Sequence, residues 1–330
     1  MDKDLASIEQ EVHILTQKLI NLKKEIGKVI IGQEETVEQL LITFLAGGHA
    51  LLEGVPGLAK TLMIRTLAQA VDLKFKRIQF TPDLMPSDII GTEILEEEHG
   101  TGKKFFKFNK GPIFSNIILA DEINRTPPKT QAALLEAMQE FEVTYANKTY
   151  KLGRPFFILA TQNPIEQSGT FILPEAQQDR FLLYIKIGYP TESEEMAVLK
   201  STTGVAKTTL NKVITGEDIL RLQHLVRQVH ISDDLIAAVS KLVRATRPET
   251  TTNAYVKEWV NWGAGPRAGQ AMILTAKARA LIQGRLSVIP EDLKQVAFPV
   301  LRHRIIVNFR AESEGITSDD VTLELLKTIL

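Results

Sequence analysis

Hydrophobic residues in the first two thirds of the chain recur with two alternating patterns. Residues 5–26, 34–46, 62–71 and 130–139 carry apolar side chains at the spacing of one face of an α-helix. Short apolar runs with the length of buried strands lie before, between and after them, at 50–52, 75–80, 117–120, 156–160 and 182–187. This alternation predicts an α/β domain with a parallel sheet flanked by helices.

Two further segments have the pattern of β-hairpins inserted into this domain. Residues 93–98 and 103–108 are strand-like runs on either side of a turn that contains glycine, and 142–145 and 149–152 repeat the arrangement. The stretch 83–115 is long for a connection in a compact domain, so we expect a functional insertion there. A solvated excursion without a function is the alternative.

The pattern changes after Pro190, where strand-like runs cease. Five helices are predicted, at 192–200, 217–229, 233–245, 267–283 and 291–302. We therefore expect an α/β domain over residues 1–203, with an N-terminal helix over 1–28, and an all-helical lid domain over 204–330.

Composition narrows the function without identifying it. The chain has 330 residues, enough for two domains, and a formal net charge of −1, which offers no electrostatic case for a dedicated nucleic-acid binder. The absence of cysteine excludes disulfides, thiolate metal sites and cysteine nucleophiles. No apolar run has membrane-spanning length, and charged residues interrupt the start of the chain, so we expect no membrane insertion and a cytoplasmic location.

The segment from Gly54 to Thr61 carries the clearest chemistry. It reads Gly-Val-Pro-Gly-Leu-Ala-Lys-Thr and joins a predicted strand to a predicted helix. A strand, a glycine turn and a helix N-terminus place backbone N–H groups around a phosphate chain. Lys60 supplies an ammonium for the β- and γ-phosphates, and Thr61 a hydroxyl for Mg²⁺. Ala59 stands where the usual pattern has its second glycine, and a plain strand-turn-helix corner is the alternative.

A second signal follows the apolar run 117–120, which ends in Asp121 and Glu122. Carboxylates at the C-terminal end of a central parallel strand open into a ligand site. One can hold hydrated Mg²⁺ and the other can take a proton from water. Combined with the glycine segment some sixty residues earlier, the pair indicates a nucleotide phosphate site; the alternative for Asp121 is a helix cap.

Four weaker candidates lie elsewhere. Asn163, at a strand tip, has an amide that could orient a water molecule, and Val29 with Ile30 could wall an adenine ring or be a buried connector. Arg180 is open to a salt bridge with a neighbouring acid, and Arg267 begins a helix where it could meet a phosphate or face solvent.

These motifs, in this order, resemble AAA+ ATPases and, more narrowly, the MoxR family. The resemblance rests on five segments and extends from about Val29 to about Arg304: Gly54–Thr61 with its alanine, Asp121-Glu-Ile-Asn-Arg125, Ala160-Thr-Gln-Asn-Pro164, Leu173-Pro-Glu-Ala176 with Asp179-Arg-Phe181, and Gly265-Pro-Arg-Ala268. It implies a P-loop NTPase core with hairpin inserts and a helical lid.

The resemblance also implies residue roles. Lys60 and Thr61 are the Walker A lysine and the Mg²⁺ hydroxyl, Asp121 the Walker B metal-binding acid, Glu122 the general base and Asn163 sensor 1. Arg180 is the arginine finger offered to a neighbouring subunit's ATP, and Arg267 is sensor 2. The implied ATP-binding residues are Val29, Ile30, Gly54, Pro56, Gly57, Leu58, Ala59, Lys60, Thr61, Leu62 and Arg267.

From these roles we expect a Mg²⁺-dependent ATPase. The resemblance implies a homo-oligomeric ring of six copies and a chaperone-like role in maturing or assembling protein complexes, with von Willebrand factor A-domain proteins as partners. A DNA-directed ring motor and a nucleotide-gated scaffold without catalysis are the alternatives. The net charge counts against the first, and Glu122 with Arg180 against the second.

Overall fold

The computed structural model describes residues 2–97, 104–164, 169–203 and 209–329. Its centre is a five-stranded parallel sheet in the order β2-β5-β8-β1-β9. The strands are β1 (Ala50–Glu53), β2 (Phe75–Gln79), β5 (Ile117–Asp121), β8 (Phe157–Gln162) and β9 (Leu183–Lys186). All five agree with predicted strands to within a few residues.

The central strands are buried on both faces, which explains why their sequences are continuously apolar. Along β5, Ile117 and Leu119 enter one hydrophobic cluster, while Ile118 and Ala120 enter another. The first cluster includes residues of helices α1 (Asp2–Gly27), α2 (Glu34–Leu45) and α3 (Lys60–Ala70). The second includes residues of α4 (Pro86–Ile90) and α5 (Pro128–Glu140). The sheet is therefore the middle layer of a three-layer core.

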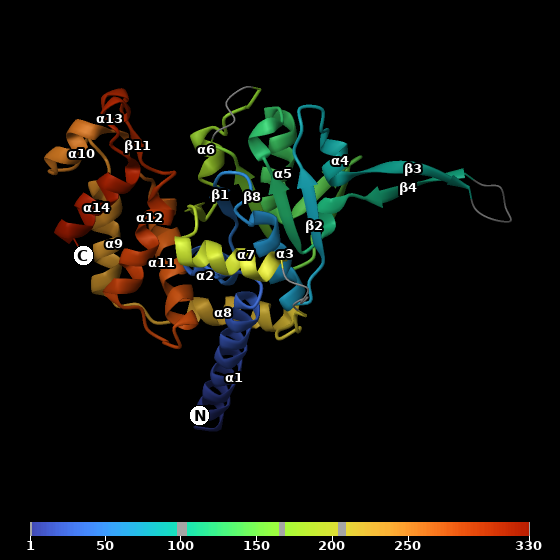
Figure 1. Ribbon diagram of the computed structural model, residues 1–330, viewed down its shortest axis with the longest axis horizontal. Helices are drawn as coiled ribbons and strands as arrows, with labels where there is room; N and C mark the ends of the chain where they lie inside the picture. The colour runs from blue at the N-terminus through green and yellow to red at the C-terminus, as the bar shows by residue number, and fades with distance from the viewer. Residues whose placement is uncertain (1, 98–103, 165–168, 204–208, 330) are drawn as a thin grey trace.

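Both predicted hairpins are present. One consists of β3 (Gly91–Glu97) and β4 (Lys104–Lys110) and projects from the body of the molecule (Figure 1). The other consists of β6 (Glu142–Tyr145) and β7 (Lys148–Lys151). Phe108 of the first hairpin stacks on Tyr145 and Tyr150 of the second, with ring centroids 5.1 and 4.6 Å apart. The two inserts are thus packed together at the base of the long arm.

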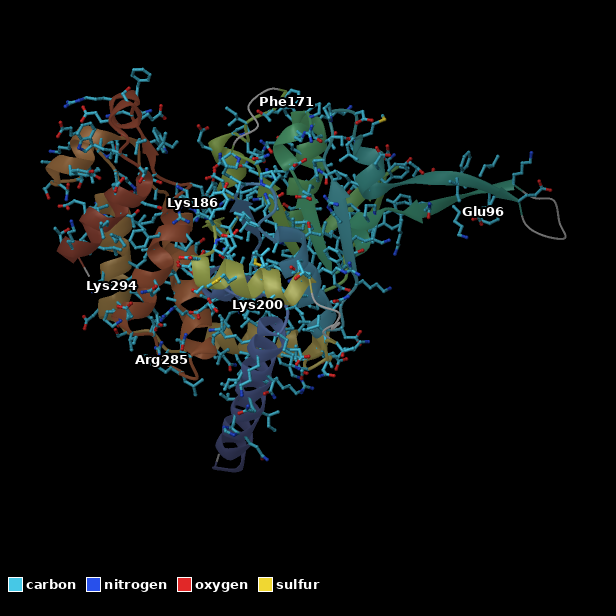
Figure 2. All side chains as sticks on the ribbon, in the orientation of Figure 1. Glu96, Phe171, Lys186, Lys200, Arg285 and Lys294 are labelled. Carbon is cyan, nitrogen blue, oxygen red and sulfur yellow. The ribbon has the colours of Figure 1, made fainter. Side chains whose placement is uncertain are left out.

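The long arm carries the charge pairing expected between its strands. Lys107 bonds both oxygens of Glu96 at 3.0 Å, and Glu96 marks the arm in Figure 2. Both side chains are largely exposed, so the pair contributes no more than about 1 kcal/mol. Glu98 and Lys103, the predicted inner ends of the two strands, lie outside the described residues.

The rest of the chain is mainly helical, but the predicted all-helical region also contains a short antiparallel strand pair, β10 (Val260–Trp262) with β11 (Ile306–Val307). Its main helices are α7 (Glu192–Thr203), α8 (Gly216–Gln228), α9 (Asp233–Ala245), α11 (Pro266–Ile282) and α12 (Pro290–Leu301). Within the α/β part of the chain, the elements not predicted from the sequence are η1 (Pro112–Phe114), η2 (Ile123–Arg125) and α6 (Glu175–Gln178). Within the C-terminal part they are α10 (Ala254–Trp259), α13 (Phe309–Glu314), α14 (Ser318–Ile329) and the antiparallel pair of β10 and β11. The expected α/β core with hairpin inserts and a helical C-terminal region is therefore confirmed.

The expected boundary between residues 203 and 204 stays a prediction. Residues 204–208 lie outside the described part of the chain. Helix α8, which follows this gap, contributes Ile219 and Leu222 to the same cluster as α1, α2 and α11. It therefore packs with elements on both sides of the predicted boundary.

Candidate functional site

The segment Gly54–Thr61, called the glycine loop below, turns sharply between β1 and α3. Gly57 and Ala59 both have positive φ, at 89° and 55°. A side chain at Gly54 would place its Cβ 2.0 Å from Ile187 Cγ2, so only glycine fits there. The alanine that departs from the usual pattern thus adopts the left-handed backbone that a glycine would take more readily.

Lys60 begins α3 and folds back over the loop. Its Nζ donates a hydrogen bond to the Gly54 carbonyl oxygen at 2.7 Å. Burial lowers the pKa of Lys60, whereas the charges of Asp121 and Glu122 raise it. The ammonium therefore lies within electrostatic reach of both acids, and the glycine loop and the acidic strand end share one edge of the sheet.

Thr161 organises the acidic pair. It lies near the end of β8, the strand next to β5, and is fully buried. Its hydroxyl donates to Asp121 Oδ1 at 2.6 Å and accepts the Glu122 backbone N–H at 2.9 Å. Glu122 has φ 58°, a left-handed conformation that Thr161 helps to hold. One side chain thus orients the metal-ligand candidate and the general-base candidate together.

Strand β2 and the short helix η2 supply further partners of the two acids. Arg77 donates to Asp121 Oδ2 from Nε at 2.9 Å and from Nη2 at 2.6 Å. Gln79 Nε2 donates to Glu122 Oε2 at 2.7 Å, and Arg125 Nη1 reaches the same oxygen at 3.1 Å. Arg77, Gln79 and Thr161 were not predicted as site residues from the sequence. Their one signal is position, because each lies near the C-terminal end of a strand adjacent to β5.

The donor set fits Mg²⁺ as a partly hydrated ion. Among the described residues no group of three or more His, Asp or Glu side chains could hold a metal. Thr61 and Asp121 offer one hydroxyl and one carboxylate at this edge, and Mg²⁺ characteristically binds few protein groups while keeping waters and substrate phosphates. The space beside Gly57 is open, since a Cβ there would meet no atom within 4 Å.

The other predicted residues near this edge occupy defined places. Asn163 directly follows β8 and is buried. Ile30 is buried and Val29 packs against the first hydrophobic cluster, in the connection between α1 and α2. Gln33, at the end of that connection, donates from Nε2 to the Gly188 carbonyl at 2.9 Å. Residues 29–33 are therefore a packed connector tied to the chain after β9.

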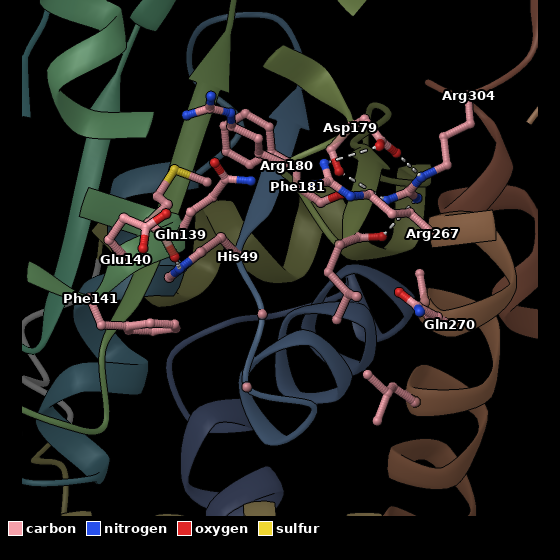
Figure 3. A pocket seen from close by; sticks show the side chains of 16 residues that line it. His49, Gln139, Glu140, Phe141, Asp179, Arg180, Phe181, Arg267, Gln270 and Arg304 are labelled. Carbon is pink, nitrogen blue, oxygen red and sulfur yellow. Dashed lines mark hydrogen bonds and ion pairs between the residues drawn. The ribbon is translucent and has the colours of Figure 1, made fainter. Parts of the chain in front are cut away.

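Arg180 and Arg267 lie at the end of the sheet where β1 begins, opposite the end that carries the glycine loop and the two acids. The Leu182 N–H bonds the His49 carbonyl at 2.8 Å, which places Arg180 beside the start of β1, whereas the glycine loop follows the end of β1. The four residues of β1 alone span about 13 Å. The two arginines line one cavity of about 450 Å³ (Figure 3). Neither is brought together with Lys60 in the same copy.

Within the described residues Arg180 forms no ion pair, contrary to the salt bridge weighed as its alternative. Asp179 instead pairs with Arg267 at 3.4 Å and with Arg304 at 2.7 Å, as Figure 3 shows. The Arg267 pair is exposed and weak, so it leaves that guanidinium available. The structure thus presents two arginines at a surface cavity remote from the acids.

Arg304 fixes the segment that carries Arg180. It is buried and donates to the Phe181 carbonyl at 2.8 Å and the Val300 carbonyl at 2.6 Å, in addition to its Asp179 bond. Burial lowers its pKa, and Asp179 raises it. His303 Nε2 lies 3.1 Å from the same Phe181 oxygen. The only sequence signal for these contacts is the run of three consecutive basic residues, 302–304.

The sheet order, a glycine loop after one central strand, paired acids after another and a helical C-terminal region define an AAA+ ATPase. Residues 49–183 match the model for the ATPase family associated with various cellular activities, and 253–325 match the AAA lid domain. A crystal structure of a Cytophaga hutchinsonii protein proposed to be an ATPase superposes with a TM-score of 0.92 at 43% identity, covering 99% of this chain and 98% of that one.

Similar proteins identify the family within the AAA+ ATPases. Chaperone MoxR1 of Mycobacterium tuberculosis is 43% identical over 97% of this chain and 82% of its own length. The uncharacterized protein YeaC of Bacillus subtilis is 41% identical over 97% and 96%, and the protein MoxR of Paracoccus denitrificans 30% identical over 85% and 86%. The chain belongs to the MoxR family of AAA+ ATPases. No helix among the described residues is long and apolar enough to cross a membrane.

Proposed function

We propose that the chain hydrolyses ATP to ADP and phosphate at the glycine loop, with Mg²⁺ held through Thr61 and Asp121. Bound Mg²⁺ would neutralise charge on the β- and γ-phosphates. Lys60 exchanges its bond to Gly54 for phosphate oxygens, and Glu122 takes a proton from the attacking water. Asn163, which directly follows β8, orients that water. The arrangement of Asp121, Thr161 and Glu122 supports these roles because both carboxylates are already oriented.

The nucleotide site extends along the loop and toward the connector. Backbone N–H groups of the glycine loop and of the first turn of α3 surround the phosphates. The residues that line this part of the site are Gly54, Pro56, Gly57, Leu58, Ala59, Lys60, Thr61 and Leu62, and Pro56 has no N–H to donate. Val29 and Ile30 lie in the connector that is tied to Gly188, and we assign them to the adenine side of ATP. Because Ile30 is buried, the backbone of this segment contacts the base more than its side chain does.

The positions of Arg180 and Arg267 are the reason for proposing that the protein forms an oligomer. Both lie at the sheet edge away from Lys60, so they reach a triphosphate only when a second copy presents its glycine loop to their cavity. Arg180 then serves as the arginine finger and Arg267 as sensor 2, both in trans. A contact between different faces repeats from copy to copy and forms a ring when the rotation between copies closes; we propose a closed ring of six copies.

The work of the ring is proposed to be remodelling of a protein client in the cytoplasm. One relative at 43% identity is named a chaperone, and the exposed hairpin arm offers a surface for a client. A von Willebrand factor A-domain protein is the proposed partner class. Capture of clients on Glu122→Gln rings held with ATP would identify the bound protein.

A DNA-directed motor is the competing function, supported by the exposed lysines of β4. Of these, Lys107 is already paired with Glu96. Measuring ATP turnover with and without duplex DNA separates the two functions. Clear stimulation by DNA would favour the motor, and an unchanged rate would favour a protein client.

The Glu122→Gln variant tests the proposed chemistry. It keeps the shape of the side chain but cannot accept a proton, so turnover should fall by about 10²–10⁴-fold while ATP still binds. Omitting Mg²⁺ should abolish turnover of the unaltered protein. Glu136→Gln, on the surface of α5, is the matched control and should retain full activity. Normal turnover in Glu122→Gln would remove this residue from the reaction.

A further inference from the structure

Helix α7 is a surface helix with an unusual composition of its outer face. It lies wholly within the described residues, and none of its residues is buried. Glu192, Glu195, Met196 and Leu199 are all exposed and stand at positions i, i+3, i+4 and i+7, so they form one stripe. Met196 and Leu199 expose 51% and 57% of their surface. Lys200 marks this helix in Figure 2.

A complementary groove runs along α9 on the helical domain. Two hollows, of about 340 and 430 Å³, meet at Ser240 and Arg244, and we call them together the α9/α11 groove. Ile236, Val239 and Ile273 supply apolar walls, and Lys241, Arg244 and Arg247 supply positive charge. No described residue lining either hollow is acidic.

The cations of the groove are poorly neutralised. Arg247 Nε donates to the Ala264 carbonyl at 3.0 Å, and within the described residues Lys241 and Arg244 form no ion pair. The stripe on α7 has the opposite character, with two acids preceding two apolar side chains. A helix that enters an apolar groove uses anchors three or four residues apart, and Met196 and Leu199 have this spacing.

We propose that α7 of one copy docks in the α9/α11 groove of its neighbour, with Met196 and Leu199 on the apolar walls and Glu192 and Glu195 against Lys241 and Arg244. This inference rests on the proposed delivery of arginines in trans.

The positions of the two surfaces agree with that delivery. Glu194 of α7 packs on Gly32, so α7 adjoins the connector assigned to the adenine side. Pro266 and Gln270, which line the groove, flank Arg267 on α11. When Arg267 approaches a neighbour's nucleotide, its groove is therefore brought toward the neighbour's α7. The two contacts form a single interface between different faces, which suits a ring.

Cross-linking tests the contact directly, because the chain has no native cysteine. Leu199→Cys and Ser240→Cys variants are mixed with ATP and treated with a short bismaleimide. Proximity should raise the yield of covalent dimer in the mixture about tenfold over either variant alone. Glu217→Cys, on α8, replaces Leu199→Cys as a control and should give the background yield. Sedimentation of each sample reports whether rings have formed.

Charge-reversal variants provide an independent test of the α7 contact. Glu195→Lys and Arg244→Glu should each raise the concentration needed for half-assembly by about tenfold, and mixing or combining them should restore assembly. Glu217→Lys and Lys257→Glu are exposed controls that should assemble normally. Rings that form without the specific cross-link and tolerate both reversals would overturn the α7 contact while leaving the proposed ATPase intact. Absence of rings in the unaltered protein would overturn both the α7 contact and the proposed delivery of arginines in trans.

Discussion

The hydroxyl of Thr161 donates a hydrogen bond to Asp121 Oδ1 at 2.6 Å, and this single contact joins two neighbouring strands at the candidate site. The Thr161 hydroxyl oxygen also accepts the backbone N–H of Glu122 at 2.9 Å. Thr161 therefore helps to orient both acids, together with Arg77, Gln79 and Arg125, although it does not itself touch substrate. Thr161 is a positioning residue.

Replacing Thr161 with valine keeps its shape and removes both hydrogen bonds. We expect kcat to fall by about 10- to 100-fold, since a lost hydrogen bond to a charged group costs about 1.5–3 kcal/mol. Thr161→Ser keeps the hydroxyl and should recover most of the activity. Thr144→Val, on the exposed second hairpin, is the control. Steady-state ATPase assays of the three variants decide, and wild-type kcat in Thr161→Val would refute the role.

Arg304→Gln should separate ATP binding from hydrolysis. The change removes the donors that hold residues 179–182, so Arg180 loses its position, while the glycine loop of the same copy is untouched. Stability should fall by about 3 kcal/mol, the lower end for a broken buried pair, because Asp179 is partly exposed and keeps Arg267.

The test of Arg304 needs two measurements. Urea unfolding gives the loss of stability, and nucleotide titration against turnover shows whether binding survives when kcat falls. Arg310→Gln removes exposed ion pairs to Glu258 and Glu314 and should change neither quantity. Equal losses of ATP affinity and kcat in Arg304→Gln would indicate general unfolding instead of a displaced Arg180.

Because His49 is buried, we expect the folded protein to lose stability in acid. Burial lowers the pKa of His49 to about 4, and in its neutral form Nδ1 accepts the Ile158 N–H while Nε2 donates to the Met138 carbonyl. The unfolded chain takes up this proton near pH 6.5, so between there and pH 4 the free energy of unfolding should fall by about 1.4 kcal/mol per pH unit. His303, also buried with a lowered pKa, adds to the slope.

Urea titrations at pH 7 and pH 5 check this dependence. His49→Gln should reduce the difference in stability between the two pH values by about 2 kcal/mol, because one proton is no longer excluded from the folded state. His224→Gln, at an exposed position on α8, should leave the difference unchanged. An unchanged difference in His49→Gln would show that this histidine titrates equally in both states.

The sequence predicted the elements whose signals are local. Continuous apolar strands, a glycine turn before Lys60 and acids at the end of β5 are each readable from a few adjacent residues. They located the strands of the core and placed the glycine loop and the two acids each at the end of a strand. The short β10 and β11 pair was missed because two or three residues per strand leave no periodicity.

Contacts between distant segments could not be predicted in this way. The bond from Thr161 to Asp121 depends on how β8 sits against β5, and the contact of Gln79 with Glu122 depends on β2 lying on the other side of β5. Arg304 reaches Asp179 across 125 positions. In each case the residue type is ordinary, and its role comes from the tertiary packing alone.

The central claim is that each site draws Lys60 from one copy and Arg180 from another. Lys60→Ala and Arg180→Ala proteins should each be inactive, and mixing them should restore turnover at about a quarter of the sites of a closed ring. Sedimentation must show that the two variants assemble together. Recovery of turnover in such mixed rings is the predicted result, and mixed rings that remain inactive would contradict the account.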